Sequence, residues 1–249
     1  MSKNDEAPKD GVSRRRMLQA GGLFALGAGV EGCNVNLQRL ANGLTTGSNS
    51  NTNTGTSATS GSVGNVDCVL TPELTEGPYY IDVDLLRTDI TEGKAGVPLA
   101  LTATIVEANT CEPIPDVVFE IWHADAEGSY SGFQSEGTRG ETFLRGAQIT
   151  DTNGKATIQT IYPGWYQGRA VHIHAKVHLS SQSVVTTQFF FSDDLTDEVY
   201  ANNAPYNQRG QRSTLNASDG IFPNDNDVVL NVESDGNGGY TASITIGVA

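Results

Sequence analysis

Short runs in which apolar and polar residues alternate fill the chain after residue 65, and Gly, Pro, Asn or Asp residues separate them. Alternation with a period of two is typical of β-strands that bury one face. The runs predicted to form strands are Leu99–Val106, Val117–Trp122, Lys155–Tyr162, Val171–Leu179, Val184–Phe191, Val228–Val232 and Tyr240–Ile246. One short helix is expected at residues 193–200, with Asp193 or Asp194 near its N-cap. Many short strands and little helix predict an all-β fold, an antiparallel β-sandwich of Greek-key type with long loops.

Composition divides the 249-residue chain into three parts. Residues 1–33 are predicted to be a twin-arginine export signal, because Arg14 and Arg15 precede an apolar, Gly-rich run that is too short for a membrane span. Residues 34–65, rich in Gly, Ser, Thr and Asn, are predicted to be a linker, and residues 66–249 the folded domain. The protein is therefore expected to be exported to the periplasm, the extracellular space or the cell surface.

The cysteines fit an exported protein. Cys33 resembles the lipidated cysteine of a bacterial lipobox, but Glu31 is an unusual neighbour for that processing. A lipid anchor at Cys33 and cleavage elsewhere without a lipid therefore both stay open. Cys68 and Cys111 are expected to form a disulfide, with two buried thiols as the alternative.

Acidic residues outnumber basic ones, with 29 Asp and Glu against 15 Lys and Arg, which gives a net charge of -14. Nucleic acids and anionic membrane surfaces are themselves negatively charged, so this balance argues against both as partners. An anionic substrate would have to be met by a local cation such as Arg169.

Of the four histidines, His172, His174 and His178 lie within seven residues of one another. On a strand, His172 and His174 point to the same face about 6–7 Å apart, where two imidazoles can share a metal ion. A lone histidine is more often a structural hydrogen-bonding residue, which is the role expected for His123. His178 continues the face of the other two, and its part in a site stays open.

Two tyrosines near this strand offer further ligands. Tyr166 lies six residues before His172, and Tyr130 ends the segment 120–130. A phenolate oxygen is a hard anionic donor that suits a trivalent cation better than zinc. Two tyrosines and two histidines therefore indicate iron(III).

Several motifs occur together and in order between about residues 68 and 192. They are Thr75-Glu76-Gly77-Pro78-Tyr79-Tyr80, then Ile121-Trp122-His123-Ala124-Asp125 with Gly128-Ser129-Tyr130, then Phe143-Leu144-Arg145-Gly146 with Thr150-Asp151-Thr152-Asn153-Gly154, and last Pro163-Gly164-Trp165-Tyr166 with Arg169 to His174. With these motifs the chain resembles the intradiol ring-cleavage dioxygenases, the family of protocatechuate 3,4-dioxygenases and catechol 1,2-dioxygenases. The resemblance implies an enzyme that inserts both atoms of O2 into a catechol-type aromatic diol and yields a cis,cis-muconate-type diacid.

The resemblance also implies residue roles by position. One non-haem iron(III) per chain would be held by Tyr130, Tyr166, His172 and His174. In the family the second tyrosine, here Tyr166, leaves the metal and acts as a base, while Arg169 lies against the bound catechol and Gln188 matches a glutamine beside the ligands. The residues expected at the substrate pocket are Tyr79, Tyr80 and Trp165. A monomer and a homodimer are both compatible with the sequence.

Two other interpretations stay open. An exported β-sandwich binding module without catalytic iron would carry the histidine pair incidentally, and a zinc hydrolase using His172, His174 and His178 would leave the two tyrosines unexplained. The identity of the diol is also open, because Ala170-Val171 stand where the family commonly has Pro and Ala, and because the loop after Tyr166 is short.

Overall fold

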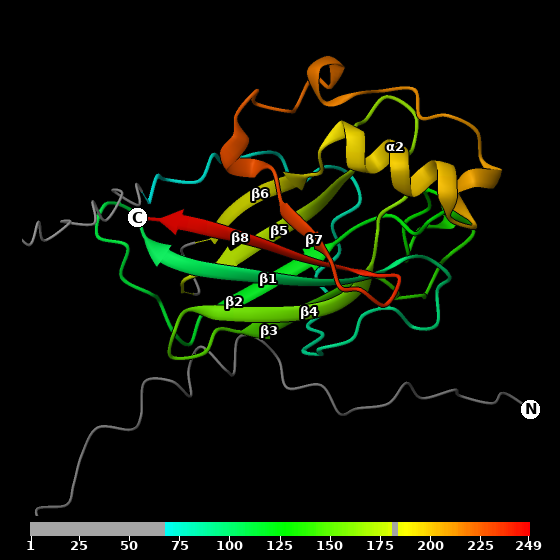
Figure 1. Ribbon diagram of the computed structural model, residues 1–249. Coiled ribbons are helices and arrows are strands. Elements are labelled where there is room, and N and C mark those ends of the chain that lie inside the picture. The colour runs from blue at the N-terminus through cyan, green and yellow to red at the C-terminus, as the bar shows by residue number, and fades with distance from the viewer. Residues whose placement is uncertain (1–67, 181–183) are drawn as a thin grey trace, which may run out of the picture.

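The computed structural model describes residues 68–180 and 184–249, and in this part the chain forms two layers of β-sheet and one α-helix (Figure 1). The strands are β1 (Pro98–Glu107), β2 (Val118–Trp122), β3 (Arg145–Ile149), β4 (Lys155–Ile161), β5 (His172–His178), β6 (Val184–Phe190), β7 (Asn231–Ser234) and β8 (Tyr240–Val248). The helices are α2 (Asp193–Asn202) and the short 3-10 turns η1 (Gln134–Glu136), η2 (Tyr206–Gln208), η3 (Asn216–Ser218) and η4 (Asn226–Val228). The predicted export signal with Cys33 and the predicted linker lie outside the described residues.

Strands are ordered β4-β1-β8-β7 in one sheet and β3-β2-β5-β6 in the other, which confirms the predicted β-sandwich. Neighbouring strands run antiparallel with one exception in the described ranges, the parallel pair β1 and β8, in which Leu99 lies opposite Tyr240. The sequence predicted antiparallel pairing throughout. Parallel pairing is possible here because the chain between β1 and β8 includes the whole second sheet and α2, which is long enough for it to cross over.

Two predicted elements differ from the structure. Residues 228–232 were expected to form one strand, but η4 ends at Val228 and β7 begins only at Asn231. β3 was not predicted, because its sequence contains a glycine and lacks apolar alternation. The glycine, Gly146, lies opposite Ile121, and a Cβ there would come within 2.6 Å of the Ile90 side chain. The formation of β3 therefore depends more on its pairing with β2 than on the strand propensity of its own residues.

The helix α2 confirms the expected helical segment, but its N-cap is Ser192 rather than Asp193 or Asp194. The backbone of Ser192 is extended, and its hydroxyl accepts a hydrogen bond from the Leu195 amide at 3.3 Å. Both aspartates lie in the first turn, where a negative charge interacts favourably with the helix dipole.

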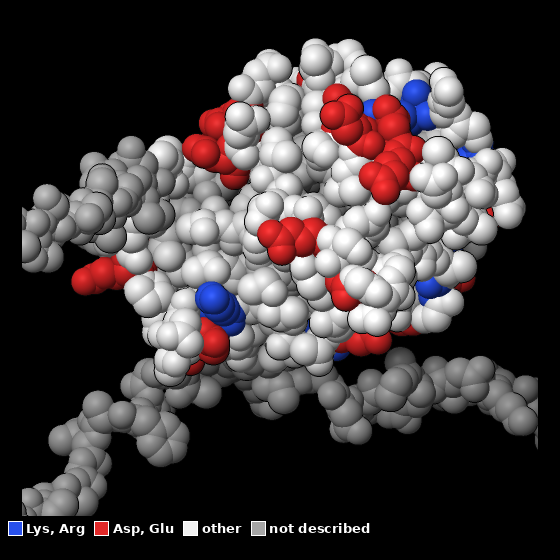
Figure 2. Space-filling model, in the orientation of Figure 1, with Lys and Arg blue, Asp and Glu red and all other residues white. Residues whose placement is uncertain are grey.

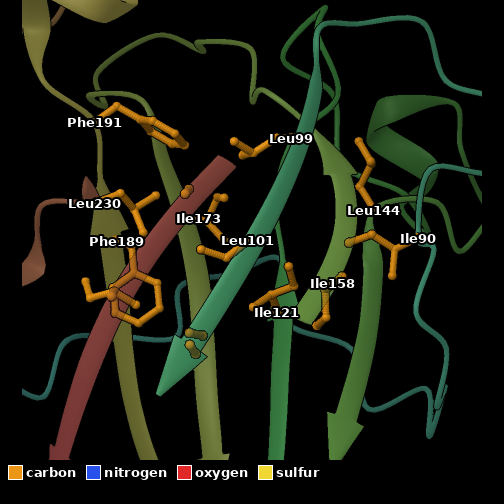
Figure 3. Close-up of a cluster of buried hydrophobic side chains, with 14 of the residues drawn as sticks. Ile90, Leu99, Leu101, Ile121, Leu144, Ile158, Ile173, Phe189, Phe191 and Leu230 are labelled. Atoms are coloured by element: carbon orange, nitrogen blue, oxygen red, sulfur yellow. The ribbon is translucent and has the colours of Figure 1, made fainter. Parts of the chain in front are cut away.

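Alternate side chains of the strands fill the space between the two sheets. Leu99 and Leu101 of β1 face Ile121, Ile173 and Phe189 of the other sheet, and each is at most 1% exposed (Figure 3). Burying a side chain of this size contributes about 1.5–3 kcal/mol to folding. The core therefore holds the second sheet rigidly enough to present side chains on its other face.

A disulfide joins Cys68 to Cys111, as predicted, with 5.4 Å between the Cα atoms. The Asn109 amide also donates to the Cys68 carbonyl at 3.1 Å, and Leu70 forms a bridge with Gly247 of β8. The start of the described chain is thus fixed to the turn after β1 and to the last strand.

The face of sheet β3-β2-β5-β6 that points away from the core carries buried polar and aromatic residues. Trp122 on β2, His174 on β5 and Gln188 on β6 lie opposite one another in the register, and His172 lies opposite Phe190. The loop that precedes β1 covers part of this face, since the Gln188 side chain donates to the Thr75 carbonyl at 2.7 Å. This covered outer face is where the predicted ligands meet.

None of the helices in residues 68–180 and 184–249 is long and apolar enough to span a membrane. On the molecular face shown in Figure 2, acidic side chains cover more surface than basic ones, in keeping with the net charge of -14. Much of the exposed surface of β1 and β8 in this view is uncharged.

Candidate metal centre

Four donor atoms converge on the outer face of the second sheet. Nε2 of His172 lies 3.0 Å from Nε2 of His174, 3.2 Å from Oη of Tyr166 and 3.5 Å from Oη of Tyr130. Tyr130, His172 and His174 are at most 3% exposed, whereas Tyr166 is partly exposed. The structure therefore brings together the four residues that were predicted as metal ligands.

Tyr130 and Tyr166 come from two loops that pack backbone to backbone. The Gly164 amide donates to the Asp125 carbonyl at 3.0 Å, and a Cβ on Gly164 would clash with that carbonyl. Only glycine allows this close approach. The Asp125 carboxylate shapes the first loop by accepting from the Ser129 amide at 2.9 Å, directly before Tyr130.

The hydrogen bonding of His172 fixes which nitrogen faces the cluster. Its Nδ1 lies 2.7 Å from the Ala170 carbonyl, and because a carbonyl only accepts, Nδ1 carries the proton. Burial, together with the nearby charge of Arg169, lowers the pKa of His172 to about 3, so the ring is neutral. His172 therefore presents the Nε2 lone pair to the cluster, the form in which imidazole binds a metal.

His174 is held mainly by packing. Its ring lies parallel to that of Trp122, with 4.9 Å between centroids and 8° between planes. The Nδ1 atom of His174 is buried and has no hydrogen-bond partner among the described residues. Burial and the neighbouring His172 and Arg169 lower the pKa of His174 well below its usual range, so this ring is neutral as well.

The donor set fits a metal ion. Ligands that bind one cation at about 2.0–2.2 Å lie roughly 3 Å from one another, which agrees with the distances between these donors. Burial is the largest cause that raises the pKa of the Tyr130 and Tyr166 phenols, and a trivalent cation between them would reverse the preference by stabilising phenolate. Two hard phenolate oxygens and two neutral imidazoles are a donor set suited to iron(III).

His178 shares the face of His172 and His174 but lies apart from their cluster. Its Nε2 is 3.0 Å from Oε2 of Glu120, a buried carboxylate on β2. Within the described ranges, no group of three or more His, Cys, Asp or Glu side chains could hold a metal ion. A three-histidine zinc site is therefore not formed by these residues, and a metal site here needs the tyrosines.

Arg169 lies on the loop before β5, as predicted, next to Gly168 with its positive φ of 85°. Its Nη2 donates to Oε1 of Gln188 at 2.6 Å, and its Nε donates to Oδ2 of Asp219 at 2.9 Å. The remaining Nη1 lies 3.4 Å from Nε2 of His172. The guanidinium is thus held on two sides and faces the donor cluster with its third nitrogen.

No sequence motif indicated that Asp219 belongs to this site. Its stretch, Ser218-Asp219-Gly220, reads as an ordinary turn far along the chain. Burial raises the pKa of Asp219, but hydrogen bonds from the Ala170 and Ile221 amides and the charge of Arg169 outweigh it, and the net pKa is lowered. Asp219 therefore carries a negative charge beside Arg169.

Aromatic rings enclose the donor cluster on one side. Tyr79 stacks on Tyr130 with 4.3 Å between centroids and 3° between planes, and Phe133 meets Tyr79 edge-on. Tyr80 packs against Trp122 at 4.9 Å. Both tyrosines predicted at the substrate pocket thus lie beside the cluster, and their contact with a substrate stays a prediction.

Trp165, the third predicted pocket residue, packs elsewhere. It contacts the main core cluster, and the guanidinium of Arg209 lies 4.8 Å from its ring centroid. Its contact with a substrate also stays a prediction. His123 has the structural role that was expected, since it is buried with Nδ1 2.8 Å from the Ala124 carbonyl and Nε2 2.7 Å from the Thr160 hydroxyl.

Comparison with known proteins agrees with this geometry. Residues 71–206 match the model of a family described as dioxygenase. Catechol 1,2-dioxygenase of Acinetobacter baylyi is 31% identical over 147 residues, which cover 50% of this chain and 47% of the relative. The chain thus spans about half the length of the curated relatives it matches.

Solved structures match over a longer part of the chain. An intradiol ring-cleavage dioxygenase from Tetranychus urticae is 33% identical, covers 72% of this chain and 94% of its own, and superposes with a TM-score of 0.67. The dioxygenase domain of a carbohydrate-binding fusion protein from Streptomyces sp. SirexAA-E is 30% identical, covers 72% of this chain and 99% of its own, with a TM-score of 0.54. Since the family model, the fold and the site motifs coincide, the chain belongs to the intradiol ring-cleavage dioxygenase family.

Proposed function

We propose that the protein is a non-haem iron(III) dioxygenase that cleaves a catechol-type aromatic diol between its two hydroxylated carbons. The observation that carries the proposal is the convergence of Tyr130, Tyr166, His172 and His174 at one point. Relatives named catechol 1,2-dioxygenase and chlorocatechol 1,2-dioxygenase support this class of reaction.

One iron per chain would be held by these four side chains. Bound iron(III) supplies a Lewis acid and electron acceptor that makes the aromatic diol reactive toward O2. Both oxygen atoms enter the product, a cis,cis-muconate-type diacid, so the reaction consumes no external reductant.

The two tyrosines are proposed to have different roles, because the structure holds them differently. Tyr130 is 1% exposed, its ring stacks on Tyr79, and its carbonyl accepts from Thr138 at 2.6 Å. Tyr166 is partly exposed on a loop. Tyr166 is therefore the residue that can turn aside when the diol binds, and its Oη can accept a hydroxyl proton from the diol.

Arg169 is proposed to stabilise negative charge on the substrate ring. Its Nη1 faces the donor cluster, and both of its other nitrogens are already hydrogen bonded. A charge that is held in place before the reaction stabilises a charged transition state without reorganisation. Gln188 contributes by fixing Nη2 of Arg169.

The protein is proposed to be exported from the cytoplasm and to act outside it. The sequence of residues 1–33 supports a twin-arginine signal, and the Cys68–Cys111 disulfide supports an oxidising compartment. The periplasm, the extracellular space and a lipid-anchored position at the cell surface all meet this condition.

The test is to measure iron content, visible absorption and O2 uptake of the purified protein with a panel of catechols. We expect about one iron per chain, a red protein with a broad visible band, and one O2 consumed per diol cleaved. A colourless protein that binds diols without iron and without O2 uptake would instead identify a binding module. The diol with the highest kcat/KM would define the substrate class.

A further inference from the structure

Asp219 places a carboxylate at the site from a segment outside the part that the family model matches. It follows η3 in the stretch between α2 and β7, whereas the matched residues end at 206. This stretch runs along the edge of the second sheet, because the Leu230 amide donates to the Phe190 carbonyl of β6 at 2.9 Å (Figure 1). The chain after α2 therefore returns to the strand that carries Gln188.

The carboxylate of Asp219 is completely enclosed, with a side-chain exposure of 0%. Oδ2 accepts from Nε of Arg169 at 2.9 Å and from the Ala170 amide at 2.6 Å. Oδ1 accepts from the Ile221 and Phe222 amides at 2.7 and 3.2 Å. A buried charge is costly unless it is paired and hydrogen bonded, so this one is matched to a specific partner.

These contacts fix the plane of the Arg169 guanidinium. Asp219 holds Nε and Gln188 holds Nη2, and Gln188 is itself anchored by donating to the Thr75 carbonyl at 2.7 Å. Because guanidinium is planar, fixing two nitrogens sets the direction of the third. That third nitrogen, Nη1, lies 3.4 Å from Nε2 of His172.

Asp219 also holds the backbone that carries Arg169. The loop before β5 contains the exposed Gly168, and the space next to its Cα is open, so no side chain packs over the loop at that point. By accepting from the Ala170 amide as well as from Arg169, one carboxylate fixes both the loop and its side chain.

We propose that Asp219 is a positioning residue that orients Arg169 toward the metal centre, an inference that rests on the proposed function. It does not contact the substrate and acts only through Arg169. The segment after α2 is thereby part of the site, although it contributes no ligand.

The Asp219→Asn variant removes the charge and puts an amide in place of one acceptor oxygen. We expect kcat to fall about tenfold or more, with iron content and the visible spectrum unchanged. Asp225→Asn is the matched control, because this carboxylate lies in the same segment and accepts a local hydrogen bond, from the Asp227 amide at 3.0 Å. Its kcat should equal that of the wild type.

Two readouts separate positioning from a general structural role. The first readout is the double variant. When Asp219→Asn is added to Arg169→Ala, we expect kcat to fall by less than about twofold relative to Arg169→Ala alone, because both changes remove the same effect. A crystal structure of the iron-loaded Asp219→Asn protein should show the Arg169 guanidinium turned away from His172. If the amide variant does not fold, Asp219→Glu, which keeps the charge but lengthens the side chain, should give the same pattern.

Any of these results in solution would overturn the inference: a near-native kcat in Asp219→Asn, losses that multiply fully in the double variant, or loss of iron together with activity. An Arg169 guanidinium that keeps its place in the variant crystal would also overturn it. A wild-type protein that binds iron but cleaves no diol would contradict the proposed function instead. The crystallographic readout would then still decide whether Asp219 orients Arg169.

Discussion

The rings of Trp122 and His174 stack in parallel with 4.9 Å between their centroids, so the indole supports the face of a predicted metal-binding histidine. Nδ1 of His174 is buried, and nothing in the described part of the chain forms a hydrogen bond with it. The strand register produces this arrangement, since Trp122 of β2 lies directly opposite His174 of β5. Packing, rather than a hydrogen bond, therefore determines the direction of the His174 lone pair.

Replacing Trp122 should weaken iron binding. In Trp122→Ala the His174 ring loses its support, so we expect less iron per folded chain, in addition to a loss of about 3–5 kcal/mol in the free energy of unfolding. Phe119→Ala is the control, because Phe119 lies on the same strand but in the main core. It should lose similar stability and keep full iron in the folded fraction. Equal iron content in both variants would contradict the role of the indole.

The phenol of Tyr130 should be needed for iron or for its colour. Phenolate supplies both negative charge and the visible charge-transfer band, so Tyr130→Phe and His172→Ala should each lose iron or lose the band. Tyr162→Phe removes another buried hydroxyl, which lies 2.8 Å from the Thr196 hydroxyl in the core. That control should cost about 1 kcal/mol of stability and leave the spectrum unchanged. Full iron with a native spectrum in both site variants would exclude this ligand set.

Much of this architecture could be predicted from local sequence, because alternation of apolar residues reports directly on strands with one buried face. β1, β5 and β8 were predicted within a few residues for this reason. β3 was not predicted, since it depends on pairing with β2, and the strand predicted at residues 228–232 begins three residues before β7, which is short and mostly exposed. The formation of β3 thus depends on a partner strand from another part of the chain, whereas β7 pairs with the next strand, β8.

The residues of the candidate metal centre also differ in whether the sequence alone could predict them. His172 and His174 could be predicted because they are two residues apart on one strand, and Tyr130 and Tyr166 because they occur in the motifs of the family. Asp219 could not, since a single aspartate in a turn has no distinguishing pattern. Its role follows from the return of the chain to β6, which is a tertiary contact.

Loss of the disulfide should destabilise the domain without altering the site. Cys68 and Cys111 are 43 residues apart, and a loop of that size corresponds to about 3–4 kcal/mol in the chain-entropy account. The Cys68→Ser and Cys111→Ser double variant should show this loss in denaturant unfolding, with kcat of the folded protein unchanged. An equally stable double variant would show that the bond does not restrict the unfolded chain.

Export should depend on the arginine pair of the predicted signal. Replacing Arg14 and Arg15 with lysine keeps the charge but removes the twin-arginine motif, so we expect the full-length precursor to accumulate in the cytoplasm. Cell fractionation measures this, with Lys3→Arg as the control. Normal processing of the double variant would indicate a different export route.

Arg169→Ala should separate catalysis from metal binding. The guanidinium faces the donor cluster through Nη1 but is bound to Gln188 and Asp219, so its removal leaves all four ligands in place. A cation at this position matters most when negative charge develops on the substrate ring. We expect full iron content and red colour, with a loss of about a hundredfold or more in kcat.

The matched control for Arg169 is Arg212, which is also paired with carboxylates but lies beside α2. Its Nη1 and Nε contact Asp193 and Asp197 at 2.5 and 3.0 Å. Arg212→Ala should lower Tm and leave kcat near the wild-type value. If Arg169 served only to pair with Asp219 and Gln188, its loss would lower stability without lowering kcat, and the two variants would behave alike. Near-native kcat in iron-loaded Arg169→Ala on the best diol would therefore remove Arg169, and with it Asp219, from the catalytic mechanism.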